Sequence, residues 1–363
     1  MRVAFDEQIF ALQAYGGISR MFAELARQFI DDPDLGVRLL PLNAPVINRY
    51  LLDNPQLKAH LAVRDADHEY RSLMRYFMRV QPRRGQDIVH NTFYLPHGLV
   101  QYPRAKRIVT VHDMIPERMP ETRRRLDFLT LKRHYVSRAD HIICVSEATR
   151  IDMLDVYGPI DAPISVVHHG VDPVFQPGLP KPASLPDNYI VFVGNRGSYK
   201  DADVLMQAFA SVRAGFPDLT LLFVGGGSFT KEEHERLASL KIKDRVQHIS
   251  LRDTEMPGAY GNAVVCVFPS RFEGFGLPAL EAMACGTPTL LANATSLPEV
   301  GGDAARYFIA SDPEDLAHQI TDLLTDSEAR ASLQAAGIER AAGFTWRRAA
   351  EETLAVYRST LQD

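Results

Sequence analysis

A glycine-rich turn in the second half of the chain carries a glutamate on each side. The stretch VFPSRFEGFGLPALEAMACGTP, residues 267–288, leads from an apolar strand-like segment into a helix whose first turn holds Pro278. Backbone amides at 275–277 are then expected at the carboxyl end of the strand, where open α/β sheets bind ligands and helix N-termini suit phosphate. Glu273 and Glu281 would repel a phosphate, so we expect them to accept hydrogen bonds from sugar hydroxyls beside it. A plain surface loop followed by a helix would explain the same residues.

A second loop of this kind carries two cations. In GNRGSYKDADVLMQAF, Arg196 and Lys200 stand at a helix start, where the helix dipole disfavours positive charge. A diphosphate between them and the helix would account for both, whereas the alternative is neutralisation by Asp201 and Asp203. A third glycine loop, GGGSF at 225–229, also follows an apolar run. The phosphate-loop pattern G-x-x-x-x-G-K-[ST] does not occur, nor does G-x-G-x-x-G after the first strand, which disfavours ATPases and dehydrogenases.

The first half has similar candidates. Gly16 and Gly17 precede an amphipathic helix and follow the first apolar run. His112 comes directly after the apolar segment 107–111, and His90 follows another apolar pair. A lone histidine is more often structural than catalytic, but the carboxyl end of a strand favours a ligand contact.

These loops need parallel strands to bring them together. Short β-rich runs alternate with helical patterns along the chain, which is typical of parallel α/β layers. The predicted strands are 3–5, 107–111 and 141–145 in the first half, and 189–193, 220–224 and 264–268 in the second.

The chain divides into two α/β domains at a proline-rich linker. The segment VDPVFQPGLPKPASLPDN, 171–188, contains five prolines and no periodicity. We place the domains at 1–176 and 177–345, followed by a terminal helix at 346–363. The apolar positions of that helix recur at helical spacing, so it can finish the second domain or pack on the first.

Composition excludes several classes. The chain has 363 residues, of which 46% are hydrophobic and 23% charged, as in globular proteins. No apolar run is long enough to span a membrane, and the acids Asp6 and Glu7 disfavour a signal peptide. Cys144, Cys266 and Cys285 lack metal-type spacing, which favours reduced thiols and a cytoplasmic location.

The net charge of −5 conceals a basic region. Residues 60–140 hold 16 Lys and Arg against 9 Asp and Glu, which favours an anionic partner. The segment 71–84 predicts a basic amphipathic helix that either lies on an anionic membrane or packs on the core, and Arg123–Arg125 adds charge nearby. No nucleic-acid motif occurs, so nucleic acid is not expected as a partner.

The motifs together resemble a known family. EGFGLPALE is similar to the paired-glutamate signature of the retaining glycosyltransferase family 4, and GGISRMFAEL, VSEATRIDML, HHGVD, VGNRGSYK, SLPEVGG and FTW extend the resemblance over nearly the whole chain. FDEQIFALQAYGGISR and VGNRGSYK are most similar to its bacterial mannosyltransferase-like branch of O-antigen and polysaccharide biosynthesis. The resemblance implies a GT-B fold, with two Rossmann-like domains facing across a deep cleft and the final helix crossing back to the first domain.

The resemblance also implies roles for the candidate residues. Arg196 and Lys200 would bind the donor diphosphate, Glu273 the hydroxyls of the transferred sugar and Glu281 the ribose. The resemblance further implies that Gly17 approaches the donor phosphates, that His112 contacts the sugar near its 6-position and that Leu251 lies near the base. The implied catalytic residues are Glu273, His112, Arg196 and Lys200, and the implied donor-binding set is Gly16, Gly17, Gly194, Arg196, Lys200, Leu251, Glu273, Gly274, Phe275, Gly276, Leu277 and Glu281. Relatives commonly have Gly or Asn where this chain has Asp201, which places a carboxylate near the expected diphosphate.

We therefore expect a retaining hexosyltransferase. The favoured reaction moves mannose from GDP-mannose to a glycan or lipid-diphosphate-linked acceptor by a front-face mechanism that needs no metal and no other cofactor. UDP-, dTDP- and other GDP-sugar donors stay open, as do a nucleotide-sugar epimerase and a non-catalytic nucleotide-sugar-binding subunit. The expected location is cytoplasmic, with peripheral attachment to the inner membrane as an open alternative.

Overall fold

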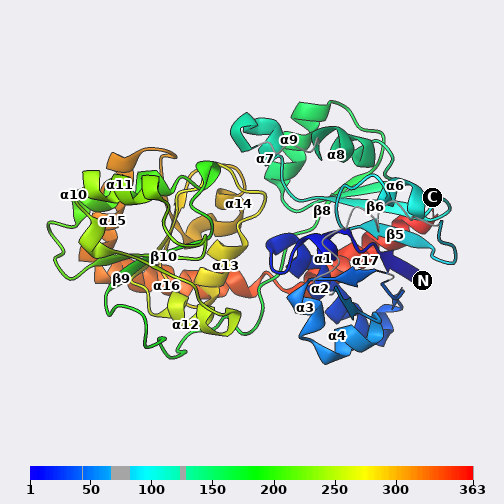
Figure 1. Ribbon diagram of the computed structural model, residues 1–363, viewed down its shortest axis with the longest axis horizontal. Helices are drawn as coiled ribbons and strands as arrows, with labels where there is room; N and C mark the ends of the chain where they lie inside the picture. Colours follow the sequence, from blue (N-terminus) through cyan, green and yellow to red (C-terminus); the bar gives the residue numbers. More distant parts are fainter. Residues whose placement is uncertain (43, 67–81, 123–127, 363) are drawn as a thin grey trace. The chain divides into compact units, whose positions relative to one another are not determined.

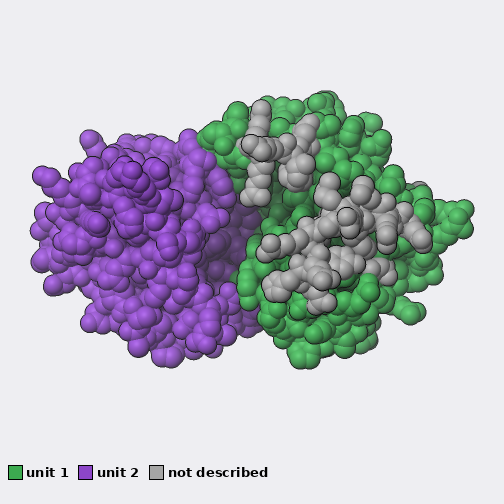
Figure 2. Space-filling view, viewed as in Figure 1, with its two compact units in different colours: residues 1–170, 346–363 green, residues 171–345 purple. Residues whose placement is uncertain are grey.

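The chain forms two compact units. The computed structural model describes residues 1–42, 44–66, 82–122 and 128–362. Unit 1 comprises Met1–Gly170 and Trp346–Asp363, and unit 2 comprises Val171–Thr345 (Figure 2). The structure thus divides the chain at the start of the proline-rich segment, between Gly170 and Val171, whereas the predicted boundary follows residue 176.

Unit 1 contains a parallel six-stranded sheet in the order β2-β1-β5-β6-β7-β8. Its central strands β5 and β7 are buried along their whole length, as in a sheet covered on both faces. A separate parallel pair is formed by β3 and β4. The strands are β1 (Arg2–Phe5), β2 (Arg38–Leu39), β3 (Pro45–Val46), β4 (Arg64–Asp65), β5 (Ile88–Asn91), β6 (Lys106–Val111), β7 (His141–Cys144) and β8 (Ile164–Val166).

The helices of unit 1 include the last helix of the chain. Helix α17 packs against α2 and contacts β6 (Figure 1). The rings of Phe29 and Tyr357 lie 6.1 Å apart across the contact between α17 and α2. The helices are α1 (Gln8–Leu12), α2 (Gly17–Asp31), α3 (Arg49–Leu52), α4 (Pro55–His60), α6 (Gly98–Gln101), α7 (Ile115–Arg118), α8 (Phe128–Val136), α9 (Glu147–Tyr157) and α17 (Trp346–Gln362), with the 3₁₀ turns η1 (Pro33–Leu35) and η3 (Pro120–Thr122).

Unit 2 contains a second parallel six-stranded sheet in the order β11-β10-β9-β12-β13-β14. The strand order reverses between β9 and β12, because β10 and β11 extend the sheet on one side and β13 and β14 on the other. The strands are β9 (Tyr189–Val193), β10 (Thr220–Val224), β11 (Val246–Ile249), β12 (Val265–Phe268), β13 (Thr289–Ala292) and β14 (Arg306–Phe308).

Helices cover both faces of the second sheet. Helix α10 packs with α15, and α13 packs with α16 on the other side of the strands (Figure 1). The helices are α10 (Ala202–Val212), α11 (Lys231–Ser239), α12 (Met256–Gly261), α13 (Leu277–Ala284), α14 (Leu297–Gly301), α15 (Pro313–Thr325) and α16 (Ser327–Ala342), with η4 (Ser198–Lys200), η5 (Lys243–Arg245), η6 (Asp253–Glu255) and η7 (Gly302–Ala304).

The predicted α/β class with two Rossmann-like domains is confirmed, and each of the six predicted strands is present within one residue at either end. The predicted basic helix at 71–84 lies largely outside the described residues, as does Arg123–Arg125. No helix of the described residues is long and apolar enough to cross a bilayer. The three cysteines are buried free thiols.

Candidate active site

Two of the predicted charged residues, of opposite sign, meet at the switch point of the unit 2 sheet. Lys200 follows β9 and Glu273 follows β12, which are the neighbouring strands between which the order reverses. The Lys200 Nζ donates to Glu273 Oε1 over 2.5 Å, although the residues lie 73 positions apart. Open α/β sheets bind ligands outside the carboxyl ends of their strands at this point. The fold therefore places an ammonium and a carboxylate together where a ligand is expected.

This ion pair is shielded but reachable. The side chains of Lys200 and Glu273 are 13% and 11% exposed, and the ammonium lies 5.4 Å from the ring centre of Tyr199. Burial alone would lower the pKa of Lys200, but the facing Glu273 carboxylate outweighs it and the net pKa is raised above its ordinary value. The ammonium is therefore charged at neutral pH.

The aspartates that follow Lys200 do not neutralise the two cations. Asp203 pairs with Arg236 at 2.6 Å, and Asp201 accepts from the Ser311 hydroxyl at 2.6 Å. The alternative in which Asp201 and Asp203 balance Arg196 and Lys200 is therefore wrong. The chain uses glutamates from more distant segments instead.

The loop between β12 and α13 is held by a turn that the sequence did not single out. The Glu273 amide donates to Thr295 Oγ1 over 2.9 Å, and the Ser296 hydroxyl donates to the carbonyls of Glu273 and Phe275. Thr295 has φ 47°, a left-handed conformation that few residues other than glycine adopt. At the N-cap of α13, Gly276 has φ 105°, and no described side chain caps this helix. The predicted phosphate-facing segment is thus a fixed loop at a helix N-terminus.

The other predicted donor contacts of unit 2 lie along the same sheet edge or just inside it. Gly194, with φ 129°, follows β9, and Leu251 follows β11. Glu281 is buried in α13, and the Tyr260 hydroxyl donates to its Oε2 over 3.3 Å. The roles assigned to Gly194, Leu251 and Glu281, and to Gly274 and Leu277 in the loop, stay predictions.

Arg196 points to a different set of partners. Its guanidinium donates to the carbonyls of Gly225, Gly227 and Ser228 and to both carboxylate oxygens of Glu233. Burial raises the pKa of Glu233, but the guanidinium outweighs it and the net pKa lies below its ordinary value. Arg196 and Lys200 therefore pair with different carboxylates, and diphosphate binding by Arg196 stays a prediction.

The predicted residues of unit 1 are a buried histidine and two glycines at the start of a helix. His112 follows β6 and is buried, and neither of its ring nitrogens has a hydrogen-bond partner among the described residues. Burial, and then the neighbouring His169 and His90, hold the pKa of His112 well below its ordinary value, so the imidazole is neutral. It can accept from or donate to a ligand hydroxyl. Gly17 begins α2, and a Cβ there would meet no atom within 4 Å, whereas one at Gly16 would meet Gln13.

A buried carboxylate directly after β1 was not among the predicted site residues. Asp6 is fully buried and accepts from Asn91 Nδ2 at 2.5 Å, Gln8 Nε2 at 2.5 Å and the Thr92 amide at 2.9 Å. Desolvation raises the pKa of Asp6 to about 6 despite these hydrogen bonds. Asn91 and Thr92 lie at the carboxyl end of β5, so only the folded sheet brings these two donors to Asp6.

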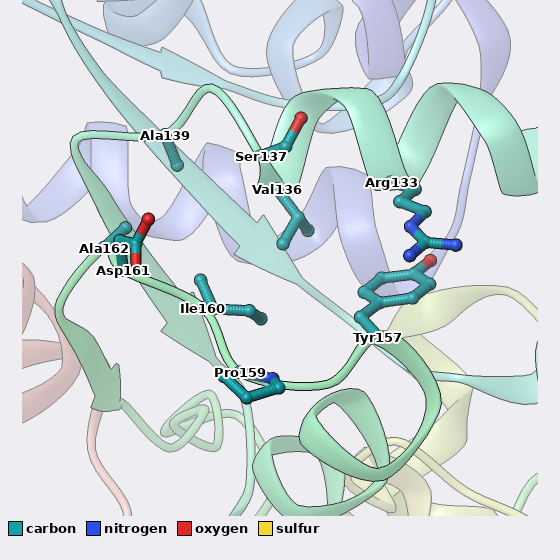
Figure 3. A pocket seen from close by; sticks show the side chains of 9 residues that line it. All are labelled: Arg133, Val136, Ser137, Ala139, Tyr157, Pro159, Ile160, Asp161 and Ala162. Atoms are coloured by element: carbon teal, nitrogen blue, oxygen red, sulfur yellow. The ribbon is translucent and has the colours of Figure 1, made fainter.

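Unit 1 also has a surface pocket away from these residues. It has a volume of about 290 Å³ and lies between the end of α8 and the loop after α9 (Figure 3). The Arg133 guanidinium lies beside the Tyr157 ring, 5.8 Å from its centre. The lining residues are Arg133, Val136, Ser137, Ala139, Tyr157, Pro159, Ile160, Asp161 and Ala162. None of the predicted site residues lines it.

Comparison with solved structures defines the class. HepE from Anabaena, solved with UDP and glucose, matches with a TM-score of 0.77 over 99% of this chain and 100% of that chain at 19% identity. Sucrose-phosphate synthase from Thermosynechococcus elongatus matches with a TM-score of 0.75 over 99% and 98% at 21% identity. The fold is that of the GT-B glycosyltransferases.

Sequence comparison then gives the family. Residues 15–175 match the family described as Glycosyltransferase Family 4, and residues 180–340 match Glycosyl transferases group 1. The MMP alpha-(1->4)-mannosyltransferase of Mycolicibacterium hassiacum is 30% identical over 77% of this chain and 72% of that protein. The chain belongs to the group 1 glycosyltransferases with a family 4 N-terminal domain.

Two further relatives show the range of the family. The D-inositol 3-phosphate glycosyltransferase of Stackebrandtia nassauensis is 33% identical over 62% of this chain, but the match spans only 56% of that protein. The O-antigen chain mannosyltransferase B of Escherichia coli is 28% identical over 73% of this chain and 72% of that protein.

Proposed function

We propose that this chain is a retaining hexosyltransferase that moves mannose from GDP-mannose to a glycan or lipid-diphosphate-linked acceptor. The observation that carries the proposal is the Lys200–Glu273 pair, 2.5 Å apart at the switch point of the unit 2 sheet. A sugar diphosphate has hydroxyls that donate to a carboxylate and phosphate oxygens that accept from an ammonium. The pair therefore matches the junction of sugar and diphosphate in a nucleotide-sugar donor.

Mannose is favoured as the transferred sugar by the relatives. The Mycolicibacterium and Escherichia proteins are both named mannosyltransferases, and the latter acts on an O-antigen chain by its name. UDP-, dTDP- and other GDP-sugars remain alternatives for the donor. The D-inositol 3-phosphate enzyme makes a phosphorylated polyol a second acceptor class to test.

The proposed reaction takes place on one face of the sugar. The bond between the anomeric carbon and the diphosphate breaks while the acceptor hydroxyl attacks from the same side. The departing phosphate oxygen takes the acceptor proton. Lys200 and the N-terminus of α13 stabilise the growing diphosphate charge, so the proposed mechanism assigns no role to a metal.

Glu273 and His112 hold the sugar in this proposal. The Glu273 carboxylate accepts from sugar hydroxyls and stabilises positive charge on the ring, while the neutral His112 contacts another hydroxyl. Glu281 is assigned to the ribose, and the amides at 275–277 to the diphosphate.

Nucleotide binding tests the donor site. Thermal unfolding is measured with GDP, UDP, dTDP and ADP at equal concentration, with and without EDTA. A nucleotide at 100 times its dissociation constant adds about 2.7 kcal/mol of stability. A selective shift with GDP that survives EDTA is expected, and a preference for UDP or dTDP would exclude GDP-mannose as donor.

Product analysis tests the chemistry. Incubation with the preferred sugar nucleotide and a lipid-diphosphate glycan should release the nucleoside diphosphate and give a product with the donor's anomeric configuration, read by NMR. Inversion would exclude the front-face mechanism. Conversion of the donor without an acceptor would indicate an epimerase, and binding without turnover a non-catalytic subunit.

A further inference from the structure

The backbone carbonyls of the loop after β10 need hydrogen-bond donors from other segments. Gly225, Gly226 and Gly227 all have positive φ, between 73° and 84°. Three successive residues in this region place their carbonyls outside any helix or strand ladder, so those carbonyls need other donors. A Cβ on Gly226 would lie 2.9 Å from the Gly194 carbonyl and 3.1 Å from Arg196, so the loop lies directly against the segment after β9.

Arg196 supplies donors to two of these three carbonyls, and His248 Nε2 also lies 3.1 Å from the Gly225 oxygen. The Arg196 Nη1 donates to the Gly225 carbonyl at 3.1 Å, and its Nη2 donates to those of Gly227 and Ser228 at 2.8 and 3.2 Å. Glu233 completes the set, with its two oxygens 2.7 and 3.2 Å from Nε and Nη2. A guanidinium has five N–H groups, so at most one of them, on Nη1, is left for a ligand in this conformation.

The surroundings of Arg196 favour a fixed side chain. Only 4% of the side chain is exposed, and the Phe229 ring covers the guanidinium with its centre 4.7 Å away. Glu233 is itself fixed by the start of α11, where it accepts from the Thr230 amide at 2.7 Å. Turning more than that one N–H toward a phosphate would require the guanidinium to leave carbonyl or carboxylate oxygens that it now contacts.

We propose that Arg196 is a positioning residue that locks the loop Gly225–Ser228 against the segment after β9, and that it does not contact the donor diphosphate. The inference rests on the proposed function for the identity of the ligand. It separates the two cations predicted for the diphosphate: Lys200 faces the ligand, while Arg196 and Glu233 shape the loop beside it. Loss of the contacts between Arg196 and this loop lowers the affinity for every nucleotide by the same factor, because Arg196 does not contact the phosphates.

Local opening of the loop is measurable without a ligand. Chymotrypsin cleaves after Phe229 only when that ring leaves its contacts with Arg196, Phe223 and His248. Arg196→Ala and Arg196→Lys should raise the rate of cleavage at this bond at least about tenfold, read by mass spectrometry. Arg236→Ala is the matched control, because Arg236 lies on α11 and pairs with Asp203 outside the loop. Equal rates in wild type and both Arg196 variants would overturn the lock.

A comparison of nucleotides tests the second half of the proposal. The nucleoside diphosphate that stabilises the wild type and the corresponding monophosphate are titrated against wild type, Arg196→Lys, Glu233→Gln and Lys200→Ala. The affinity for the diphosphate divided by that for the monophosphate should stay within about threefold of the wild-type value in Arg196→Lys and Glu233→Gln. The same ratio should fall at least about tenfold in Lys200→Ala. A tenfold fall of the ratio in Arg196→Lys with an unchanged ratio in Glu233→Gln would make Arg196 a diphosphate ligand.

The two experiments also separate this inference from the proposed function. If no nucleotide binds the wild type, the proposed donor site fails, and with it the separation of roles between the two cations. The cleavage rates show in either case whether Arg196 holds the loop Gly225–Ser228, because they are measured on the ligand-free protein.

Discussion

Lys200 and Glu273 form an ion pair in a partly desolvated place, with side chains that are 13% and 11% exposed. Removing one partner of a buried pair leaves an uncompensated charge, which costs about 3 kcal/mol. We predict that Lys200→Met lowers the free energy of unfolding by about that amount, and that Lys200→Met with Glu273→Gln lowers it by less than the sum of the single changes. Urea unfolding measures both. Activity should fall by about two to three decades in each variant.

The exposed pair Arg236–Asp203 is the control for that prediction. Its side chains are 39% and 49% exposed, and exposed pairs contribute about 0–1 kcal/mol. Arg236→Met should therefore change the free energy of unfolding little. If Lys200→Met costs no more than Arg236→Met, the pair at the switch point has no special place in the stability of unit 2.

The raised pKa of Asp6 predicts how the free energy of unfolding depends on pH. The ordinary carboxyl pKa of 3.8 rises to about 6 in the folded protein because of burial, so the folded state holds the proton where the unfolded state has lost it. Stability is then lost as the pH rises from about 4 to about 6, by up to about 3 kcal/mol.

The measurement compares wild type with Asp6→Asn. The free energy of unfolding of wild type minus that of the variant should fall between pH 4 and pH 6 and stay level above. Carboxylates with lowered pKa values, such as Asp87, act in the opposite direction but are common to both proteins. A difference that stays flat or rises with pH would contradict the desolvation of Asp6.

At the scale of elements, the junction of β12 and α13 depends on one glycine. Gly276 has φ 105°, and a Cβ there would lie 3.0 Å from Leu297 Cδ2 at the start of α14. Gly276→Ala should lower the free energy of unfolding by about 1–2 kcal/mol and weaken nucleotide binding, because alanine rarely adopts this φ and its Cβ would crowd Leu297. Calorimetry and nucleotide titration measure the two effects.

Gly197 offers the matched substitution at the same sheet edge. It has φ −68° and no atom within 4 Å of an added Cβ, so Gly197→Ala should leave the free energy of unfolding nearly unchanged. Equal losses in Gly197→Ala and Gly276→Ala would show that the conformation of Gly276 is not what holds the loop.

The elements were predictable where the signal is local. Continuous apolar runs gave β9, β10 and β12, and Pro278 with its preceding glycines gave the start of α13. The hydrogen bonds that hold the site could not be predicted, because they join residues far apart in the sequence. Thr295 accepts from the Glu273 amide 22 positions away, and Glu233 accepts from Arg196 37 positions away. Those pairings follow from strand order, and a single sequence contains strand order only through the family it resembles.

At the scale of the whole molecule, α17 belongs to unit 1 although it follows unit 2 in the chain. It buries Trp346, Leu354 and Tyr357, and the Tyr357 hydroxyl lies 2.7 Å from Nδ1 of the buried His90. Removal of residues 346–363 should unfold unit 1 and leave unit 2 folded, because unit 2 has its own sheet and core.

Hydrogen exchange resolved by peptide distinguishes the two units. Peptides from β5 and β6 should lose protection in the truncated chain, while peptides from β9 and β12 should keep it. Tyr357→Phe is the milder variant and should lower the free energy of unfolding by about 1 kcal/mol through the lost hydrogen bond. Retained protection of β5 and β6 in the truncated chain would show that α17 is dispensable for unit 1.

The discontinuous unit has a consequence for how the protein is made. Ribosomes add about 5–20 residues per second, so on the order of 10–30 s pass between synthesis of Gly170 and of α17. During that interval unit 2 can fold behind a first sheet whose α2 still exposes an apolar face. The part of the protein that is made first is therefore the last to reach its native state, and we expect newly made chains to need a chaperone on that face.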